Sequence, residues 1–447
     1  MNPFTQKRSL LSPSKQKTSL FVGVILALIA RFPFTSAEDI ENARTNLFHG
    51  ERTDFWGSFS PWFFTRISGR FWEETYAAMF ALMIFVGALL ILKTLTGFNR
   101  TPKLIFFYYL AAYYISLLFA LDFSRDGALL AFFWFALGVF SISQNVKSQK
   151  LKKFLLATSI ILFSLAFSFR PWMAPALVIF MATLKYLPLG QIFGRKYFRK
   201  IAGFCVPLLV LPVGIDLVSN ALLKLEKSYP EQQVLIMDLA SIGCLSSNPY
   251  LSGEALKALS PIVNESPVRK ARVCSQFYPS SVGSLLFYPE NWGNATSAVR
   301  LIGVNEQTSY EKVRSSWVRL LTSHPKDYVQ MKILLGSQWL LAGDSNLWRG
   351  SPLQIFLASP LSIARELRLF SGLFVLSILI GLTICNRKKS IYLCLLVFYL
   401  SSLSLLTIAF TGDNQRYLLP FSIMSFLAVA CERITQEPNS KRESNIV

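Results

Sequence analysis

The chain has 447 residues, of which 52% are hydrophobic and only 16% are charged. A soluble domain usually carries about a quarter charged residues, so the composition excludes an ordinary soluble protein. The net charge of +20 would suggest nucleic acid as a partner in a soluble chain. Much of the basic excess lies instead in short loops between apolar runs, which is typical of membrane proteins, and we exclude nucleic acid as a partner.

Apolar runs recur along the whole sequence, and each is long enough for a membrane helix or close to it. The ten runs are Leu20–Phe34, Tyr76–Leu92, Leu104–Leu121, Ala128–Ile142, Phe154–Phe169, Ala174–Leu187, Ile201–Val218, Leu369–Cys385, Ile391–Phe410 and Tyr417–Cys431. At about 1.5 Å per residue, helices of this kind cross a hydrocarbon core of roughly 30 Å. The sequence therefore predicts an all-α polytopic membrane protein with about ten transmembrane helices. The first run also resembles a signal peptide, although we favour an uncleaved anchor.

Lysine and arginine fall in alternate loops, which predicts the orientation of the chain. With a cytoplasmic N-terminus, the inner loops hold the groups Lys93/Arg100/Lys103, Lys147/Lys150/Lys152/Lys153, Arg195/Lys196/Arg199/Lys200 and Arg387/Lys388/Lys389. The acidic loops with Asp39, Asp126 and Asp413 then lie outside. We expect an integral protein of the plasma (inner) membrane with both termini in the cytoplasm.

A long polar region separates the seventh and eighth runs and predicts an extracytoplasmic domain. The expected division is 1–218 for the N-terminal membrane region, 219–368 for the outer domain, 369–431 for the C-terminal membrane region and 432–447 for a cytoplasmic tail. The segment from Ser309 to Leu341 has apolar residues at helical spacing, interrupted at His324–Pro325. Cys244 and Cys274 are the only cysteines of the outer region, so we expect a structural disulfide there, with two free thiols as the alternative.

Charged side chains next to the apolar runs gather on the predicted outer side. They are Glu38, Asp39, Asp122, Arg125, Asp126, Arg170, Asp238, Asp413 and Arg416. Charges near membrane depth are costly and often functional, but a loop carboxylate is commonly just solvated and an arginine at a helix end often reaches for headgroups. A carboxylate and arginines together suit group transfer at the outer leaflet, because a carboxylate can act as a general base and guanidinium groups can hold a phosphate.

Four short motifs resemble the GT-C superfamily of integral-membrane glycosyltransferases. They are "ED" at Glu38–Asp39 after the first helix, "RD" at Arg125–Asp126, the Trp…Pro…Tyr pattern of "SSWVRLLTSHPKDYVQMKI", and "DNQRYLLPF" at the entry of the last helix. The last motif is similar to that of members that use polyprenyl-phosphate sugars.

The resemblance implies an inverting sugar transfer from a polyprenyl-phosphate donor to a glycan, lipid or protein acceptor outside the cytoplasm. It implies Asp39 as the catalytic base with Glu38 second, Arg416 as a ligand of the donor phosphate, and Arg125 and Asp126 as parts of the donor or acceptor site. On physical grounds alone, Arg170 is a further phosphate ligand. The first loop has no clear DxD pair, so no metal ligand is assigned and a divalent cation stays open.

Two other functional classes stay open. One is a polysaccharide polymerase or ligase of the O-antigen type, which uses the same lipid-linked donors but would carry its key arginines in large outer loops. The other is a transporter or flippase of lipid-linked glycans, which would show internal repeats and charges at mid-membrane depth. The sequence has no detectable repeat, and its charges lie at the edge of the apolar runs.

Overall fold

The computed structural model describes about half of the chain. The described residues are 13–31, 63, 73–96, 103–121, 125–169, 194–223, 232–260, 273–274, 307–341 and a few positions between 376 and 400. Within these ranges every regular element is a helix, and there is no strand. The predicted all-helical class is therefore confirmed for the part of the chain that is described.

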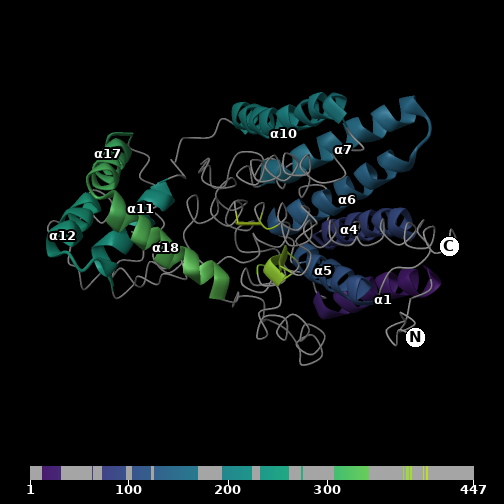
Figure 1. The fold of residues 1–447 in the computed structure, drawn as a ribbon, viewed down its shortest axis with the longest axis horizontal. Coiled ribbons are helices and arrows are strands. Elements are labelled where there is room, and N and C mark those ends of the chain that lie inside the picture. The colour runs from purple at the N-terminus through teal and green to yellow at the C-terminus, as the bar shows by residue number, and fades with distance from the viewer. Residues whose placement is uncertain are drawn as a thin grey trace, which may run out of the picture.

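Six helices form a bundle that coincides with six of the predicted apolar runs (Figure 1). They are α1 (Pro13–Arg31), α4 (Glu73–Thr96), α5 (Lys103–Leu121), α6 (Arg125–Asn145), α7 (Gln149–Phe169) and α10 (Gly194–Leu223). In α4, α6 and α7 the apolar stretch is long enough to cross a membrane. The sixth predicted run and most of the last three lie outside the described residues, so the number of about ten remains a prediction.

Several helices extend beyond the apolar runs. Helix α10 includes the basic segment from Arg195 to Lys200 and ends at Leu223, five residues past the expected end of the run. Helix α7 begins at Gln149 and so contains three of the lysines assigned to a loop. Charged side chains are compatible with helical backbone, so hydropathy marks the apolar part of a helix rather than its ends.

Helix α6 occupies the centre of the bundle, where it packs against α4, α5 and α7. Its Trp134 is fully buried, and the indole Nε1 donates a hydrogen bond to Ser116 Oγ of α5 at 2.9 Å. On its other side Ser159 of α7 donates to the carbonyl of Ala136 at 3.1 Å. Inside an apolar bundle such pairs satisfy polar atoms that have no water to bind.

Two glycines let α4 and α6 approach closely. A Cβ atom at Gly138 would lie 2.8 Å from the Cα atom of Gly87, and one at Gly87 would overlap the backbone of Trp134 and Phe135. Small residues of this kind allow membrane helices to pack backbone against backbone. The central contact of the bundle therefore depends on the absence of a side chain at these positions.

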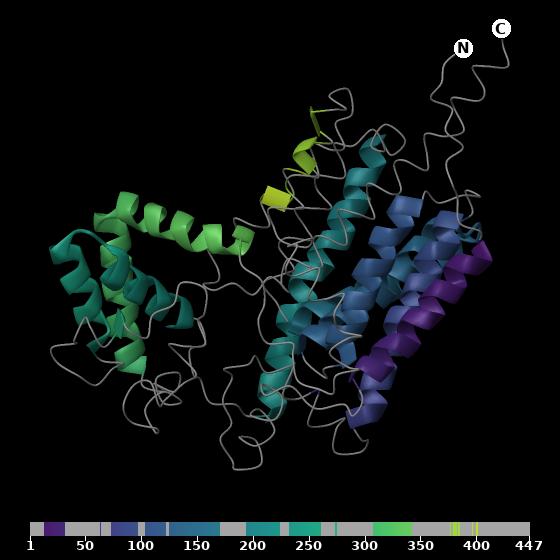
Figure 2. The ribbon, with the colours of Figure 1, turned by 90° about the horizontal axis from the view of Figure 1, so that it is seen from below.

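Four further helices form a separate group with its own core (Figure 2). They are α11 (Gln232–Leu245), α12 (Pro249–Ala258), α17 (Gln307–Ser323) and α18 (Pro325–Leu341). Asn248 caps α12 by accepting hydrogen bonds from the backbone N–H groups of Tyr250 and Leu251, and Pro249 occupies the first turn. The break between α17 and α18 falls at His324–Pro325, which confirms the predicted interruption.

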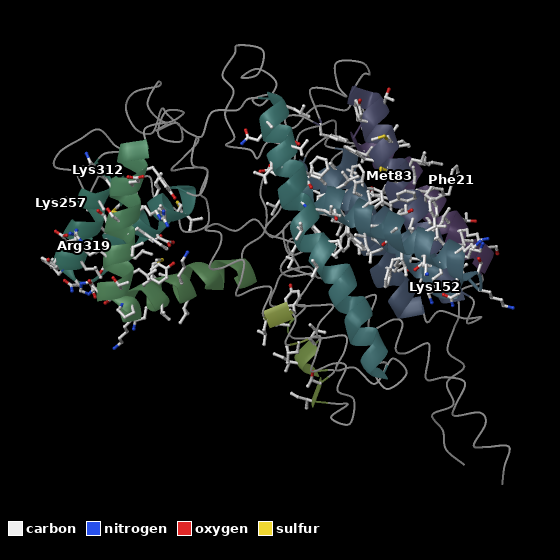
Figure 3. All side chains as sticks on the ribbon, turned by 90° about the horizontal axis from the view of Figure 1, so that it is seen from above. Phe21, Met83, Lys152, Lys257, Lys312 and Arg319 are labelled. Carbon is white, nitrogen blue, oxygen red and sulfur yellow. A yellow bond between two sulfur atoms is a disulfide. The ribbon has the colours of Figure 1, made fainter. Side chains whose placement is uncertain are left out.

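This group lies within the region predicted to be the outer domain, and we call it the outer helical group. Figure 2 shows it beside the bundle, with α18 extending from it toward the bundle. The short turn between α6 and α7, which carries Lys147, lies at the end of the bundle farther from this group (Figure 1). The residue labelled Lys152 marks the same end in Figure 3. The first turn of α6, with Asp126, therefore lies at the end nearer the outer helical group.

The close contact between α4 and α6 leads to a stability prediction. Gly87→Ala should destabilise the protein by about 1–3 kcal/mol, because the added methyl overlaps backbone atoms that have no room to move. Thermal unfolding of the purified protein in detergent measures the effect. Gly214→Ala is the matched control, since nothing lies within 4 Å of a Cβ atom there. Equal unfolding temperatures for the two variants would contradict the packing described.

Candidate functional site

The described residues include two of the predicted site residues, Arg125 and Asp126. Both stand in the first turn of α6. The remaining predicted site residues, Glu38, Asp39, Arg170 and Arg416, lie outside the described residues, as does Asp413. The side chain of Arg125 also lies outside them, so the geometry of this site begins with Asp126.

Asp126 is buried at the start of α6, with only 7% of its surface exposed. The next residue, Gly127, brings α6 against the end of α5, because a Cβ atom there would lie 2.8 Å from the Cα atom of Ala120. A carboxylate in the first turn of a helix is favoured by the partial positive charge of the helix N-terminus. The sequence predicted an outer-edge residue here, and the structure adds that its side chain is shielded from solvent.

Three phenylalanines from different segments meet near this end of the bundle, and we call them the aromatic cluster. Phe63 comes from the segment between α1 and α4, Phe132 from α6, and Phe169 is the last residue of α7. Ring centroids are 5.2 Å apart for Phe63 and Phe169, 6.1 Å for Phe63 and Phe132, and 5.9 Å for Phe132 and Phe169. None of the three is more than 9% exposed, so the cluster is a packed contact that joins three segments.

A second polar cluster, which we call the Asp238 clasp, lies inside the outer helical group. Asp238 of α11 is fully buried, and its Oδ1 atom is 2.7 Å from the Lys332 ammonium of α18. Its Oδ2 atom accepts hydrogen bonds from Trp317 Nε1 of α17 at 3.1 Å and from the Tyr328 hydroxyl of α18 at 3.0 Å. One carboxylate thus holds three helices together.

The electrostatics of the clasp follow from its burial. Burial raises the pKa of Asp238, while the Lys332 ammonium and the two hydrogen-bond donors oppose the rise. Burial and the neighbouring carboxylate raise the pKa of Tyr328 well above its ordinary value, so this hydroxyl stays a donor at physiological pH. The ring of Tyr328 also faces the Lys332 ammonium, 5.7 Å from its centroid.

The clasp positions helices and has no surface for a substrate. Asp238 is fully buried and both of its oxygens have partners, so it does not join Asp126 in one site. The sequence marked Asp238 as an aspartate in an apolar stretch, and Trp317 and Tyr328 belong to the Trp…Pro…Tyr pattern. Lys332 was missed. The sequence signal that could have identified it was a single lysine in an apolar segment, four residues after Tyr328. A buried carboxylate such as Asp238 needs a cation, and this lysine is a candidate for it.

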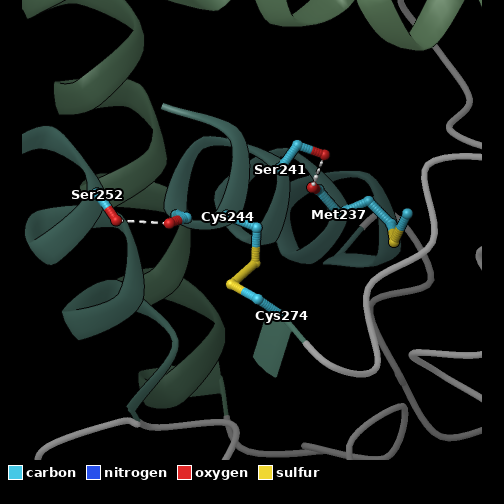
Figure 4. The surroundings of a disulfide bond; sticks show 6 residues. Met237, Ser241, Cys244, Ser252 and Cys274 are labelled. Carbon is cyan, nitrogen blue, oxygen red and sulfur yellow. Dashed lines mark hydrogen bonds between the residues drawn. A yellow bond between two sulfur atoms is a disulfide. The ribbon is translucent and has the colours of Figure 1, made fainter. Parts of the chain in front are cut away.

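The expected disulfide between Cys244 and Cys274 is present (Figure 4). It ties the end of α11 to residues 273–274 across 30 positions of sequence, with the Cα atoms 5.4 Å apart. In the same region the Ser252 hydroxyl of α12 donates a hydrogen bond to the carbonyl of Gly243. A Cβ atom at Gly243 would lie 2.9 Å from the Leu256 side chain, so α11 and α12 pack closely beside the bond.

Within the described residues, no group of three or more His, Cys, Asp or Glu side chains is placed to hold a metal ion. The chain matches no protein-family model, no curated protein and no solved structure. Among the charged residues that the sequence singled out, the described structure shows a buried carboxylate at the end of α6 and a structural clasp in the outer helical group.

The clasp gives a prediction about unpaired charge. Lys332→Met should cost about 3–5 kcal/mol of stability, because it leaves the buried Asp238 carboxylate without its cation. Asp238→Asn/Lys332→Met should recover most of this loss, since the amide carbonyl still accepts from Trp317 and Tyr328 and no charge is buried. Thermal unfolding in detergent measures both.

The matched control for the clasp is Arg319→Met, which removes an ion pair with Glu254 whose arginine is 65% exposed. Exposed pairs contribute about 0–1 kcal/mol, so this variant should unfold close to the wild-type temperature. A Lys332→Met variant as stable as Arg319→Met would show that the pair does not hold the helices.

The disulfide gives a separate prediction. Cys244→Ser/Cys274→Ser should lower stability by about 2–4 kcal/mol, because the unfolded chain regains the freedom that the cross-link removes. The measurement is thermal unfolding of the full-length protein purified without reductant. Cys205→Ser is the control, since it removes a cysteine from the seventh predicted apolar run. Equal loss in both would mean that removal of a cysteine, and not of the bond, is responsible.

Proposed function

We propose that the protein is a membrane glycosyltransferase that moves a sugar from a polyprenyl-phosphate donor to an acceptor on the extracytoplasmic face. The aromatic cluster carries the proposal. Phe63 belongs to the loop that contains Glu38 and Asp39, Phe132 lies six residues after Asp126, and Arg170 directly follows Phe169. Contact among these three phenylalanines supports the convergence of the three predicted site segments at one end of the bundle.

The proposed membrane topology follows from which end of the bundle lies toward the outer helical group. The lysine-bearing turn between α6 and α7 lies away from the outer helical group, while the first turn of α6 lies toward it. With the lysines cytoplasmic, as the positive-inside rule expects, Asp126 and the outer helical group face the extracytoplasmic side of the plasma membrane. The cytoplasmic position of both termini follows from this orientation as a proposal.

In the proposed reaction Asp39 accepts the proton of an acceptor hydroxyl, with Glu38 as the second candidate. The acceptor oxygen forms a bond to the anomeric carbon, and the bond from that carbon to the phosphate oxygen breaks. Polyprenyl phosphate leaves with the electron pair, and Arg416 and Arg170 stabilise its negative charge. Arg125 and Asp126 shape the donor or acceptor site beside it.

The buried state of Asp126 supports a role beyond solvation. A carboxylate that merely ends a polar turn gains nothing by leaving water, since burial of a charge is costly. Asp126 is nevertheless 7% exposed at the end of α6 where donor and outer helical group would meet. This is the described residue whose environment most favours the glycosyltransferase over a passive loop.

The test is transfer of a labelled sugar from polyprenyl phosphate by the purified full-length protein. A panel of lipid-linked donors is offered with delipidated cell envelope as the acceptor, and loss of label from the lipid phase is measured. Asp39→Asn should lower the rate by a factor of about 10²–10⁴, since the general base is lost. Asp327→Asn is the matched control, because it removes the same charge from an aspartate of the outer helical group that is 45% exposed.

Each outcome has a defined meaning. Equal rates for Asp39→Asn and wild type would remove Asp39 as the base. No transfer from any lipid-linked donor by correctly folded protein would overturn the proposal. Movement of intact donor across vesicle membranes would then identify a flippase instead.

A further inference from the structure

Helix α7 carries two kinds of side chain along one exposed face. At 3.6 residues per turn, five exposed residues fall within about 100° of the helix circumference. We call them the α7 stripe, and they are Lys150, Lys153, Phe154, Ala157 and Ile161. The first two are cations and the other three are apolar. Phe154 and Ile161 are 66% and 55% exposed, so the apolar part of the stripe is fully available for contact.

The opposite face of α7 packs into the bundle. Ser159, Phe163 and Ala166 are buried there, and within the described residues α7 packs against α6 and α10. Lys152 lies on this packed side of the helix and is half-buried, although only one residue separates it from the stripe. The stripe therefore faces away from the helices that α7 contacts.

The cations of this segment have no counter-charge nearby in the described chain. Four lysines occur within seven positions, and within the described residues none of them forms an ion pair. Helix α6 ends without an acidic residue, and α7 contains none. The lysines do not stabilise their own helix either, because the partial positive charge at a helix N-terminus disfavours cations there. The anion that balances them must come from outside these residues.

The length of the stripe matches one leaflet of a membrane. From Lys150 to Ile161 the helix rises about 16 Å, and half of a typical hydrocarbon core is about 15 Å. The stripe lies in the segment Gln149–Phe169, which is long and apolar enough to cross a membrane. Its lysines therefore stand at one boundary of the membrane, and its apolar residues lie at the depth of the lipid chains.

We propose that the α7 stripe binds an anionic phospholipid. Lys150 and Lys153 hold the headgroup phosphate, and a lipid chain lies along Phe154, Ala157 and Ile161. Two observations select this ligand. Uncompensated positive charge selects an anion, and the apolar side chains that continue the same face select a lipid over a soluble polyanion.

The proposed site differs from the general attraction of basic loops to an anionic leaflet. That attraction depends on the number of lysines at this end of the bundle, which Lys152 marks in Figure 3. Binding at the stripe depends instead on two lysines that share one face with exposed apolar residues. The inference is independent of the proposed reaction, and it does not depend on which side of the membrane is cytoplasmic.

Fluorescence quenching by brominated lipids tests the proposal in the full-length protein. The disulfide is kept, and the other cysteines are changed to serine, namely Cys205, Cys385, Cys394 and Cys431. A fluorophore is attached at Ala157→Cys, inside the stripe. The protein is placed in vesicles of phosphatidylglycerol and phosphatidylcholine, and one or the other lipid carries brominated chains. The two quenching curves give the local preference for the anionic lipid, which should be about 5- to 30-fold for two lysines.

Two double variants remove the same charge from the same segment. Lys150→Gln/Lys153→Gln takes both cations from the stripe and should abolish most of the preference for phosphatidylglycerol. Lys147→Gln/Lys152→Gln is the matched control, because Lys147 precedes the helix and Lys152 lies on its other face. This control should keep most of the preference. Lys150→Arg/Lys153→Arg should keep it as well, since the charge is retained.

Three results would overturn the proposal. The first is the absence of any preference at position 157 when all four lysines are present. The second is an equal loss in the two glutamine variants, which would mean that net charge alone attracts the lipid. The third is a loss of preference with glycerol phosphate beyond that with sodium chloride of equal ionic strength, which would identify a free phosphate as the ligand. Thermal unfolding of each labelled variant confirms that the fold is retained.

Discussion

The structure depends on one constraint, which is that polar groups placed among apolar ones must find partners inside the protein. In the bundle Trp134, Ser116 and Ser159 meet this constraint with hydrogen bonds between helices. In the outer helical group a single carboxylate, Asp238, meets it with one ammonium and two neutral donors. In both places the polar contacts fix the position and the rotation of neighbouring helices. The apolar residues then pack within the arrangement that these contacts set.

The Asp238 clasp illustrates why a buried ion pair need not be explained by stability. Its Coulombic attraction is offset by the cost of removing two charges from water, and an apolar replacement of similar volume is often as stable. The pair instead fixes the rotation of α18 about its axis, because Lys332 and Tyr328 bind the carboxylate in only one rotation of that helix. Val329 and Ile333, each one residue further along the helix, are exposed in this rotation.

The sequence predicts helices better than it predicts the partners inside them. Hydropathy located the helices around the runs at Tyr76–Leu92 and Phe154–Phe169, and His324–Pro325 marked the break between α17 and α18. Two cysteines in one outer region were enough to predict their bond. Lys332 was not predicted, because its role depends on a carboxylate 94 positions away in sequence, and no local pattern encodes that pairing. The burial of Asp126 was likewise invisible, since "RDG" reads equally well as a solvated turn.

For the candidate site, too, the sequence predicts where residues lie better than it predicts which side chains meet. Charge alone placed Glu38, Asp39, Asp126 and Arg170 on one predicted side of the membrane, but sharing a side does not bring side chains together. The aromatic cluster supplies a physical link, because Phe63, Phe132 and Phe169 pack with centroids 5.2 to 6.1 Å apart. Through Phe63, the segment between α1 and α4 thereby contacts the last residue of α7 and also α6, the helix that begins with Arg125 and Asp126. A reaction at the membrane surface needs such an anchor. Without one, the entropy lost in ordering a loop would reduce the free energy of substrate binding.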